Sequence, residues 1–390
     1  MDSGINTGVQ TPPASLSFRE VFALPGVRRL WIAQFVSVMG DLLALFAILS
    51  LASFRLHATA EQVTLISMFY MLPMAVIGPV AGVFVDRWNV KAVMIASDLI
   101  RCGLAVLLVF ARDINSFYLI LFALSFVSTF FAPAQSVTVR TIIPKHGLLA
   151  ANALLMQAFL VTRIASPAMA GALVGTFGPE SCFYADALSF LVSALMLSGI
   201  AIQRLFDNTG PPAGGVGSVL RDLVSGMKFL FGTPALSFVL IAMGAGFFVM
   251  SCFGPLIAIY VRDFLHEGSL AFGLFSALIG VGMMVGTMGL RKFGMKIASE
   301  KMVLVGLVLI GGSVLLMGGV RLAATTALSS FTLGFGVAFI LTPAQTLMMG
   351  KTPVAMVGRV SSSFMSVIAV SQMLGLVVSG SAAERIGILN

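Results

Sequence analysis

The sequence predicts an all-α polytopic membrane protein, and three observations lead to that fold class. Of the 390 residues, 58% are hydrophobic and 10% are charged, and the mean hydropathy is +1.05. Soluble domains are about 45–50% apolar and about 25% charged. The apolar residues gather in runs of about 20 or more, and the alternation of a β-barrel is absent, so only helices can satisfy the backbone within lipid. The composition excludes a water-soluble globule, a disordered chain and a disulfide-rich secreted module.

Eleven apolar runs are predicted to cross the membrane, six before a polar stretch and five after it. In chain order they are 29–54, 62–85, 92–111, 114–139, 147–174, 181–203, 234–261, 268–290, 302–320, 322–350 and 360–383. The predicted organisation is a cytoplasmic segment 1–27, a first bundle 28–203, a cytoplasmic linker 204–233 and a second bundle 234–390. Within the linker, Arg221–Phe231 is expected to form a short interfacial helix.

The basic residues orient the chain through the positive-inside rule. With a cytoplasmic N-terminus, sixteen Lys and Arg residues fall in inner segments, and four fall in outer loops, namely Arg55, Arg112, Arg262 and Arg321. We therefore expect a multi-pass protein of a plasma membrane (a bacterial inner membrane) with its N-terminus inside. This distribution also explains the net charge of +8 without a nucleic-acid partner.

A parallel repeat relates the two halves. FFAPAQS at 130–136 matches ILTPAQT at 340–346, an offset of 210, and Arg55 aligns with Arg262 at an offset of 207. A repeat in the same direction predicts a pseudo-two-fold axis along the membrane normal. The sixth span should then recur near 388–410, whereas the sequence ends at Asn390. We expect eleven spans, with the twelfth helix missing and residues 384–390 as the loop that would lead into it.

Two short motifs carry a family resemblance. The loop after the second span has small residues at Gly78 and Gly82, four apart, which would let another helix approach closely. Asp86, Arg87 and Lys91 follow them. The pattern Gly82-x-x-x-Asp86-Arg87-x-x-x-Lys91 resembles motif A of the major facilitator superfamily. In the fifth span, a second motif resembles the antiporter signature motif C, with Ser and Ala in place of two glycines; its residues are Ser166, Pro167, Ala170 and Gly171.

The resemblance extends over about residues 18–388 and is similar to the enterobactin- and macrolide-exporter branch (drug:H⁺ antiporter-3). It implies two six-helix bundles around a central cavity and alternating access by a rocker switch. Motif A would latch the cytoplasmic side in the outward-open state. The second half departs from the pattern, because Leu290 stands where the repeat of motif A would have its acid.

Five ionisable residues lie within predicted spans, where charge is costly and marks candidate functional positions. They are Asp41, Asp98, Arg101, Arg163 and Asp186. Similar depth suggests that Arg163 pairs with Asp186, and a spacing of three places Asp98 beside Arg101 on one helix. Asp41 is then the unpaired acid near the midplane, which makes it the candidate proton carrier. In the competing interpretation, Asp41 pairs with Arg101 and Asp98 is left to water.

Uncharged polar residues in the spans are candidates for the lining of a cavity, or equally for hydrogen bonds between helices. They are Gln34, Ser37, Gln135, Asn152, Gln157, Gln345 and Gln372. The sequence has no HExxH, GxSxG or Walker pattern, so we expect no enzyme, no ATP-driven pump on this chain alone, no cofactor and no metal.

We therefore expect a monomeric secondary transporter that exports a small amphipathic compound, driven by H⁺ more readily than by Na⁺. A lysophospholipid flippase is the alternative within the same class. A non-transporting membrane sensor or scaffold is the alternative from a different class.

Overall fold

The computed structural model describes residues 16–85, 87–201, 216–293, 298–353 and 356–386. Asp86, most of the N-terminal segment, linker residues 202–215 and the last four residues therefore lie outside the described part. Within it, all regular elements are helices, and eleven of them are long and apolar enough to span a membrane, as predicted.

Six spanning helices form the first half. They are α2 (Pro25–Ser50), α3 (Ala60–Val85), α4 (Val90–Phe110), α5 (Ile114–Ile142), α6 (Leu148–Phe177) and α7 (Glu180–Ser198). Five form the second half, namely α9 (Pro234–Asp263), α10 (Ser269–Phe293), α11 (Ser299–Gly319), α12 (Ala323–Lys351) and α13 (Val357–Ile386). The short elements are α1 (Phe18–Ala23), η1 (Leu51–Arg55), η2 (Lys145–Gly147) and α8 (Val216–Gly232).

The helices of the second half repeat the packing of the first. In the first half α3 packs on α5, α5 on α4, and α2 on α6; in the second, α10 packs on α12, α12 on α11, and α9 on α13. In addition, α7 contacts α2 and α4. No helix of the described second half occupies the equivalent place beside α9 and α11. This is the eleven-helix arrangement that the repeat predicts.

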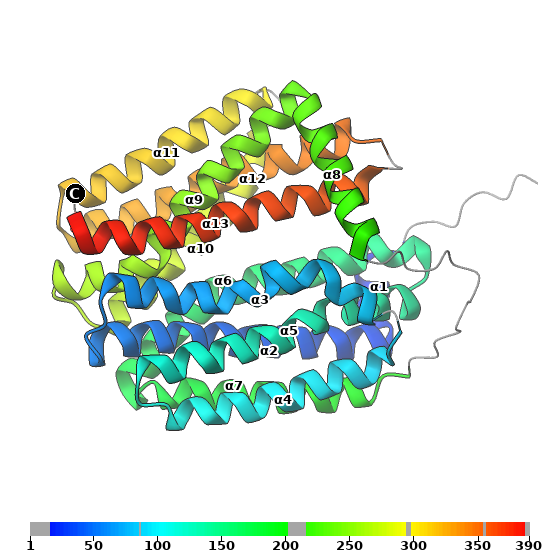
Figure 1. The fold of residues 1–390 in the computed structure, drawn as a ribbon, viewed down its shortest axis with the longest axis horizontal. Helices are drawn as coiled ribbons and strands as arrows, with labels where there is room; N and C mark the ends of the chain where they lie inside the picture. The colour runs from blue at the N-terminus through cyan, green and yellow to red at the C-terminus, as the bar shows by residue number, and fades with distance from the viewer. Residues whose placement is uncertain (1–15, 86, 202–215, 294–297, 354–355, 387–390) are drawn as a thin grey trace, which may run out of the picture.

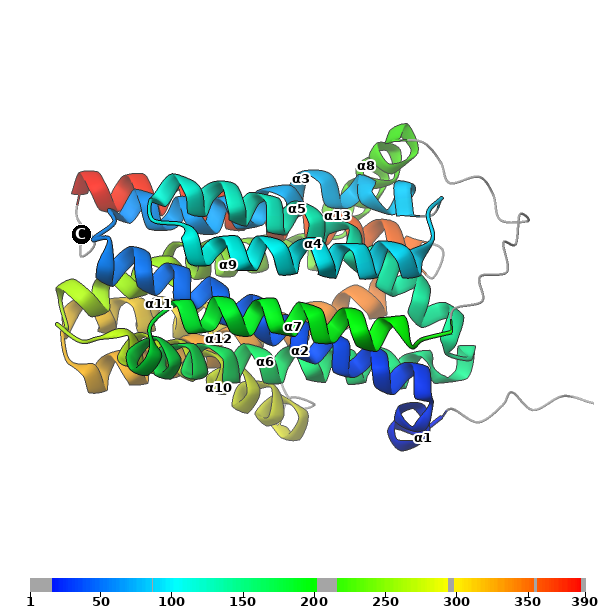
Figure 2. The same ribbon diagram turned by 90° about the horizontal axis from the view of Figure 1, so that it is seen from below.

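The two halves lie one above the other in Figure 1, with α2 to α7 below and α9 to α13 above. They meet through two equivalent pairs, α6 with α10 and α3 with α13. Both views place α1 and α8 at one end of the molecule, which we call the α8 end (Figures 1 and 2). The opposite end carries η1, and we call it the η1 end.

The exterior of the bundle is strongly apolar. Leu315, Phe177 and Leu119 are 77%, 76% and 71% exposed, and many other large hydrophobic side chains are more than one-third exposed. A soluble monomer rarely exposes so much contiguous apolar surface. Six prolines lie inside spanning helices, at 73 and 79 in α3 and at 133, 167, 255 and 343 in α5, α6, α9 and α12. Pro133 and Pro343 are the prolines of the two repeated segments.

A helix is present where a short interfacial one was expected at Arg221–Phe231, and it is longer than predicted, because α8 extends over Val216–Gly232. It is fastened to α13 by polar contacts. Asp222 forms an ion pair with Arg359 at 2.8 Å, and the Ser363 hydroxyl donates to the Leu223 carbonyl at 2.9 Å. Thus α8 belongs to the second half and not to the connection between the halves.

Candidate functional site

The centre of the first half contains one arginine between two carboxylates. Arg101 of α4 forms a hydrogen-bonded ion pair with Asp98, one turn earlier on the same helix. Its other terminal nitrogen lies 3.6 Å from the carboxylate of Asp41 on α2. The side chains of Arg101 and Asp98 are 3% and 0% exposed, whereas that of Asp41 is 20% exposed. Asp41 is therefore the member of the trio that solvent reaches.

Aromatic rings enclose the guanidinium of Arg101. Its central carbon lies 4.4 Å from the ring centroid of Phe190 on α7 and 4.9 Å from that of Phe131 on α5. Such contacts stabilise a cation that has been removed from water. Arg101 consequently joins four helices of the first half through one side chain.

Asp186 of α7 is the third carboxyl group of this region. It is fully buried, and neither carboxylate oxygen has a hydrogen-bond partner within the part of the chain described. It lies against Gly40 of α2, where an added Cβ would be 2.6 Å from the Asp186 carboxylate oxygen. The glycine therefore makes room for the acid between α2 and α7.

The pairing of Arg163 with Asp186, predicted from equal depth, is wrong. No ion pair joins Arg163 to any acid of the described residues, and its guanidinium carbon lies 5.8 Å from the ring centroid of Phe159 on the same helix. Depth along a helix does not fix the direction of a side chain. Asp186 faces α2, whereas Arg163 is exposed on another side of α6.

The structure also changes which aspartate lacks an arginine partner. Arithmetic on the sequence left Asp41 without an arginine, but in the structure the acid without one is Asp186. The interpretation that pairs Asp41 with Arg101 agrees with the geometry. Its corollary is wrong, because Asp98 is not left to water but is buried against the same arginine.

Tyr70 of α3 is a further polar residue of this region. It is within electrostatic range of Asp41, Asp186, Arg101 and Arg163. Sequence reasoning missed this residue because a tyrosine within an apolar span carries no signal of its own. One signal was available, since the sequence has only four tyrosines.

Two of the expected lining amides bind each other. Gln135 of α5 donates to the side-chain oxygen of Gln34 on α2 at 2.8 Å, which favours a role in joining helices for this pair. The remaining candidates fall into two groups by exposure. Ser37 is buried and Gln372 half-buried, and the exposed ones are Asn152, Gln157 and Gln345.

The motif-A residues that the structure describes support the first half internally. The Lys91 ammonium donates to the carbonyls of Ser198 and Ile200 at 2.6 and 2.9 Å, and Arg29 donates to the Gly199 carbonyl. Both cations thus neutralise the C-terminal end of α7, where the helix dipole is negative. Arg87 is exposed in the turn after α3, and the motif acid Asp86 lies outside the described residues.

The two glycines of motif A were expected to admit a neighbouring helix. A Cβ at Gly78 would touch only Thr129 of α5, at 4.0 Å, and a Cβ at Gly82 would have no atom within 4 Å. The expected close approach is therefore absent at Gly82 in this conformation. The α3 helix still contacts the second half, through α13 and α8.

The motif-C-like residues lie where the halves close. A Cβ at Gly171 of α6 would be 3.1 Å from the Cα of Gly273 on α10, and Gly273 also approaches the Pro167 carbonyl. Ala170 is buried, and the Ser166 hydroxyl donates to the Met39 sulfur of α2 at 3.1 Å. Small residues allow such close contact between helices.

Other contacts between the halves lie at the same η1 end. Gly380 of α13 sits against Glu61 and Thr64 of α3, and Arg262 of α9 donates to the Ser53 carbonyl of η1. The rings of Phe46 and Phe272 lie 5.3 Å apart. The halves are thus packed together at the η1 end, whereas a Cβ at Gly82, near the α8 end, would have no neighbour within 4 Å.

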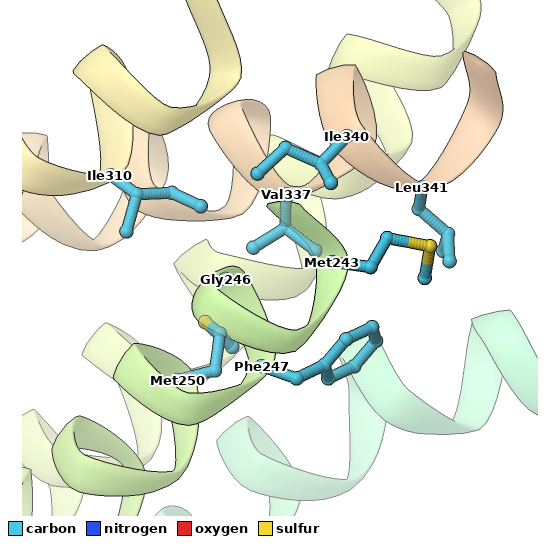
Figure 3. Close-up of a pocket in the computed structure, with 8 residues that line it drawn as sticks. All are labelled: Met243, Gly246, Phe247, Met250, Ile310, Val337, Ile340 and Leu341. Atoms are coloured by element: carbon cyan, nitrogen blue, oxygen red, sulfur yellow. The ribbon is translucent and has the colours of Figure 1, made fainter. Parts of the chain in front are cut away.

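A small void within the second half is lined by apolar side chains. Figure 3 shows eight residues around it, contributed by α9, α11 and α12: Met243, Gly246, Phe247, Met250, Ile310, Val337, Ile340 and Leu341. Its volume of about 10 Å³ is no larger than one water molecule requires. A wider recess of about 610 Å³ lies beside Arg29 and Gly199 at the α8 end of the first half. Neither contains the charged cluster.

Comparison with known proteins decides the family. The model of the Major Facilitator Superfamily matches residues 30–376, which is most of the chain. The protein belongs to the major facilitator superfamily. The transporter fold, the eleven spanning helices and the multi-pass membrane location therefore agree with what the sequence predicts.

Relatives within the superfamily include transporters and exporters. The chain is 27% identical to the MFS-type transporter YfiS of Bacillus subtilis over 368 residues, covering 93% of this chain and 88% of that protein. It is 24% identical to macrolide efflux protein A of Streptococcus pyogenes over 377 residues, covering 92% and 89%.

Among solved structures, the fold is similar to that of a bacterial homologue of the human lysosomal transporter Spinster in an inward-facing, unoccupied conformation. The TM-score is 0.72 at 13% identity, covering 95% of this chain and 84% of that one. At this identity the likeness concerns the fold alone.

Proposed function

We propose that this protein is a proton-coupled exporter of small amphipathic compounds and that Asp41 carries the coupling proton. The observation that supports the proposal is the position of Asp41. Its side chain is 20% exposed, whereas the other members of the group, Asp98, Arg101 and Asp186, are buried. An efflux protein among the relatives agrees with export as the direction of transport.

The cluster has more carboxyl groups than cations, which favours the binding of protons. One guanidinium stands among three carboxyl groups, and buried charges are retained only when they are paired. Arg101 keeps its tight contact with Asp98, so the looser contact with Asp41, at 3.6 Å, is the one that protonation would release. Protonation of Asp41 would thereby uncouple α2 from α4.

Contacts of α2 connect this uncoupling to the interface between the halves. On α2, Gly40 lies against Asp186 of α7, and Met39 accepts a hydrogen bond from Ser166 of α6. On α6, Pro167 and Gly171 are the residues that close against α10. A shift of α2 relative to α4 would act on the contact through which the η1 end is closed.

The orientation follows from the basic residues. We place the α8 end in the cytoplasm and the η1 end outside, because most Lys and Arg residues lie in segments at the α8 end. The conformation described here would then be closed to the outside. Motif A at Gly82 would close the inner side in the opposite state. The two bundles 28–203 and 234–390 would be the bodies that rock.

Proton coupling is tested with everted membrane vesicles that contain the protein and a fluorescent pH indicator. A panel of amphipathic compounds is added after a pH gradient has been imposed. We expect at least one compound to dissipate the gradient and to accumulate in the vesicles, and vesicles without the protein to do neither. Uptake of lysophospholipid alone would support a flippase, and no flux for any compound would support a sensor or scaffold; either result contradicts the proposal.

A further inference from the structure

Among the five charged residues predicted within the spans, Arg163 is the one that lies outside the cluster around Arg101. Its direction follows from its neighbours on α6. Ser166 contacts Met39 of α2, and Ile164 lies 2.8 Å from a Cβ position at Gly280 of α10. At about 100° per residue, Arg163 points between these two directions. It therefore faces the space between α2 of one half and α10 of the other.

The same face of α6 continues toward the α8 end as an exposed strip. We call this the α6 strip, and it consists of Arg163, Phe159, Met156 and Asn152. Spacings of three and four keep these residues on one side of the helix. The residues that flank the strip toward α2, Thr162, Ser166 and Ala158, are buried. The strip is therefore bounded by buried residues on the side that faces α2.

The guanidinium of Arg163 has an aromatic neighbour and no acidic one. Phe159 lies 5.8 Å from it, and Tyr70 is within electrostatic range. Among the residues that the structure describes, no carboxylate forms an ion pair with Arg163, in contrast to Arg101. A cation within a spanning segment is costly and is found where an anion or a substrate meets it.

The second half offers apolar side chains and carries its charges near the helix ends. In the second half, Phe247 and Met250 of α9 and Leu341 of α12 are half-buried and border the apolar void (Figure 3). The ionisable residues of the described parts of α9 to α13 lie near the helix ends. An occupant between the halves therefore meets a cation on one side and apolar side chains on the other.

We propose that the substrate is an amphipathic anion, whose carboxylate or phosphate binds the Arg163 guanidinium while its apolar part lies against α9 and α12. Guanidinium binds both groups well, because its donors match two oxygens at once. Phe159 holds the guanidinium from one side and leaves its outer edge for the ligand. This inference rests on the proposed transport function and narrows its substrate class.

Binding is measured without transport, so that failure of this inference differs from failure of the export proposal. Purified protein in nanodiscs of zwitterionic lipid is titrated with dansylamino-undecanoic acid and, separately, with its methyl ester. For each variant, the dissociation constant of the ester is divided by that of the acid. Partition of the probes into lipid affects this ratio equally in every variant, so it does not alter the comparison between variants. The variants are Arg163→Gln, Arg163→Lys and, as a matched control at the η1 end, Arg55→Gln.

The wild-type protein and Arg55→Gln should bind the acid about tenfold or more tightly than the ester, as one charge-assisted contact implies. Arg163→Gln should lose this preference while keeping its affinity for the ester, and Arg163→Lys should keep part of it. Equal ratios for wild type and Arg163→Gln would overturn the inference, as would the absence of binding to wild type. The vesicle assay tests the export proposal separately, so neither result of the binding experiment would decide it.

Discussion

The guanidinium of Arg101 lies 3.6 Å from the carboxylate of Asp41, on a different helix, while its other contact, with Asp98, is buried on its own helix. One arginine therefore holds a permanent partner and an exchangeable one. The permanent partner is needed to keep a cation in the bundle. The exchangeable partner is the group that solvent reaches, and it links the charge cluster to the position of α2.

Loss of Arg101 should destabilise the fold strongly. Arg101→Met leaves Asp98 buried without a partner, which costs about 3–5 kcal/mol in comparable sites. The measurement is the free energy of unfolding in mixed micelles of increasing denaturing detergent. The matched control is Arg55→Met, whose partner Glu180 and own side chain are 42% and 56% exposed, so a loss of at most about 1 kcal/mol is expected. Equal effects of the two changes would contradict the buried pairing.

Asp98 and Asp186 should respond differently to the same change. Asp98→Asn removes the charge that Arg101 binds and should lower stability, whereas Asp186→Asn removes a charge that no described side chain pairs. Thermal unfolding of the two variants in one detergent measures the difference. If Asp186→Asn unfolds at as low a temperature as Asp98→Asn, Asp186 has a partner of equal importance.

The sequence predicted the helices better than their contacts. Hydropathy identified all eleven spans because lipid demands long apolar helices. The short helix α1 was not predicted, although Ser17 and Glu20 form a capping box there, a spacing that is visible in the sequence. The η1 turn after α2 also has no hydropathy signal, since the apolar run continues through it.

The sequence predicted which charged residues belong to the candidate site, but it did not predict which of them form pairs. All five intramembrane charges were identified, because their cost in lipid makes them conspicuous. The contact of Asp41 with Arg101 agreed with one of two interpretations. The pairing of Arg163 with Asp186 failed because depth gives the position along a helix and not the direction around it.

A large side chain at the α6–α10 contact should hold the η1 end open. Gly171→Leu places bulk where Gly273 already lies within contact, so the halves cannot close there. The distance between spin labels at Arg112 and Leu322, in η1-end loops of the two halves, should increase. Gly82→Leu is the matched control, because no atom lies within 4 Å of a Cβ at that position in this conformation. A closed distance in Gly171→Leu would contradict the assignment of the contact.

The acidic pair at the α3–α13 contact should oppose closure of the same end. The side chains of Glu61 and Glu384 interact across the two halves, with Arg385 as a nearby cation. Two carboxylates repel when both are charged, so Glu384→Gln should raise the closed population between the Arg112 and Leu322 labels. Arg385→Gln should lower it. An unchanged distance distribution in both variants would show that this pair does not influence closure.

The role of Asp41 is tested most directly by comparing two transport modes in the same vesicles. Asp41→Asn keeps the size of the side chain and removes the exchangeable proton. We predict that the variant loses accumulation driven by a pH gradient and keeps substrate exchange, which needs no net proton movement. Gradient-driven accumulation equal to that of the wild type would contradict the proposal that Asp41 carries the coupling proton.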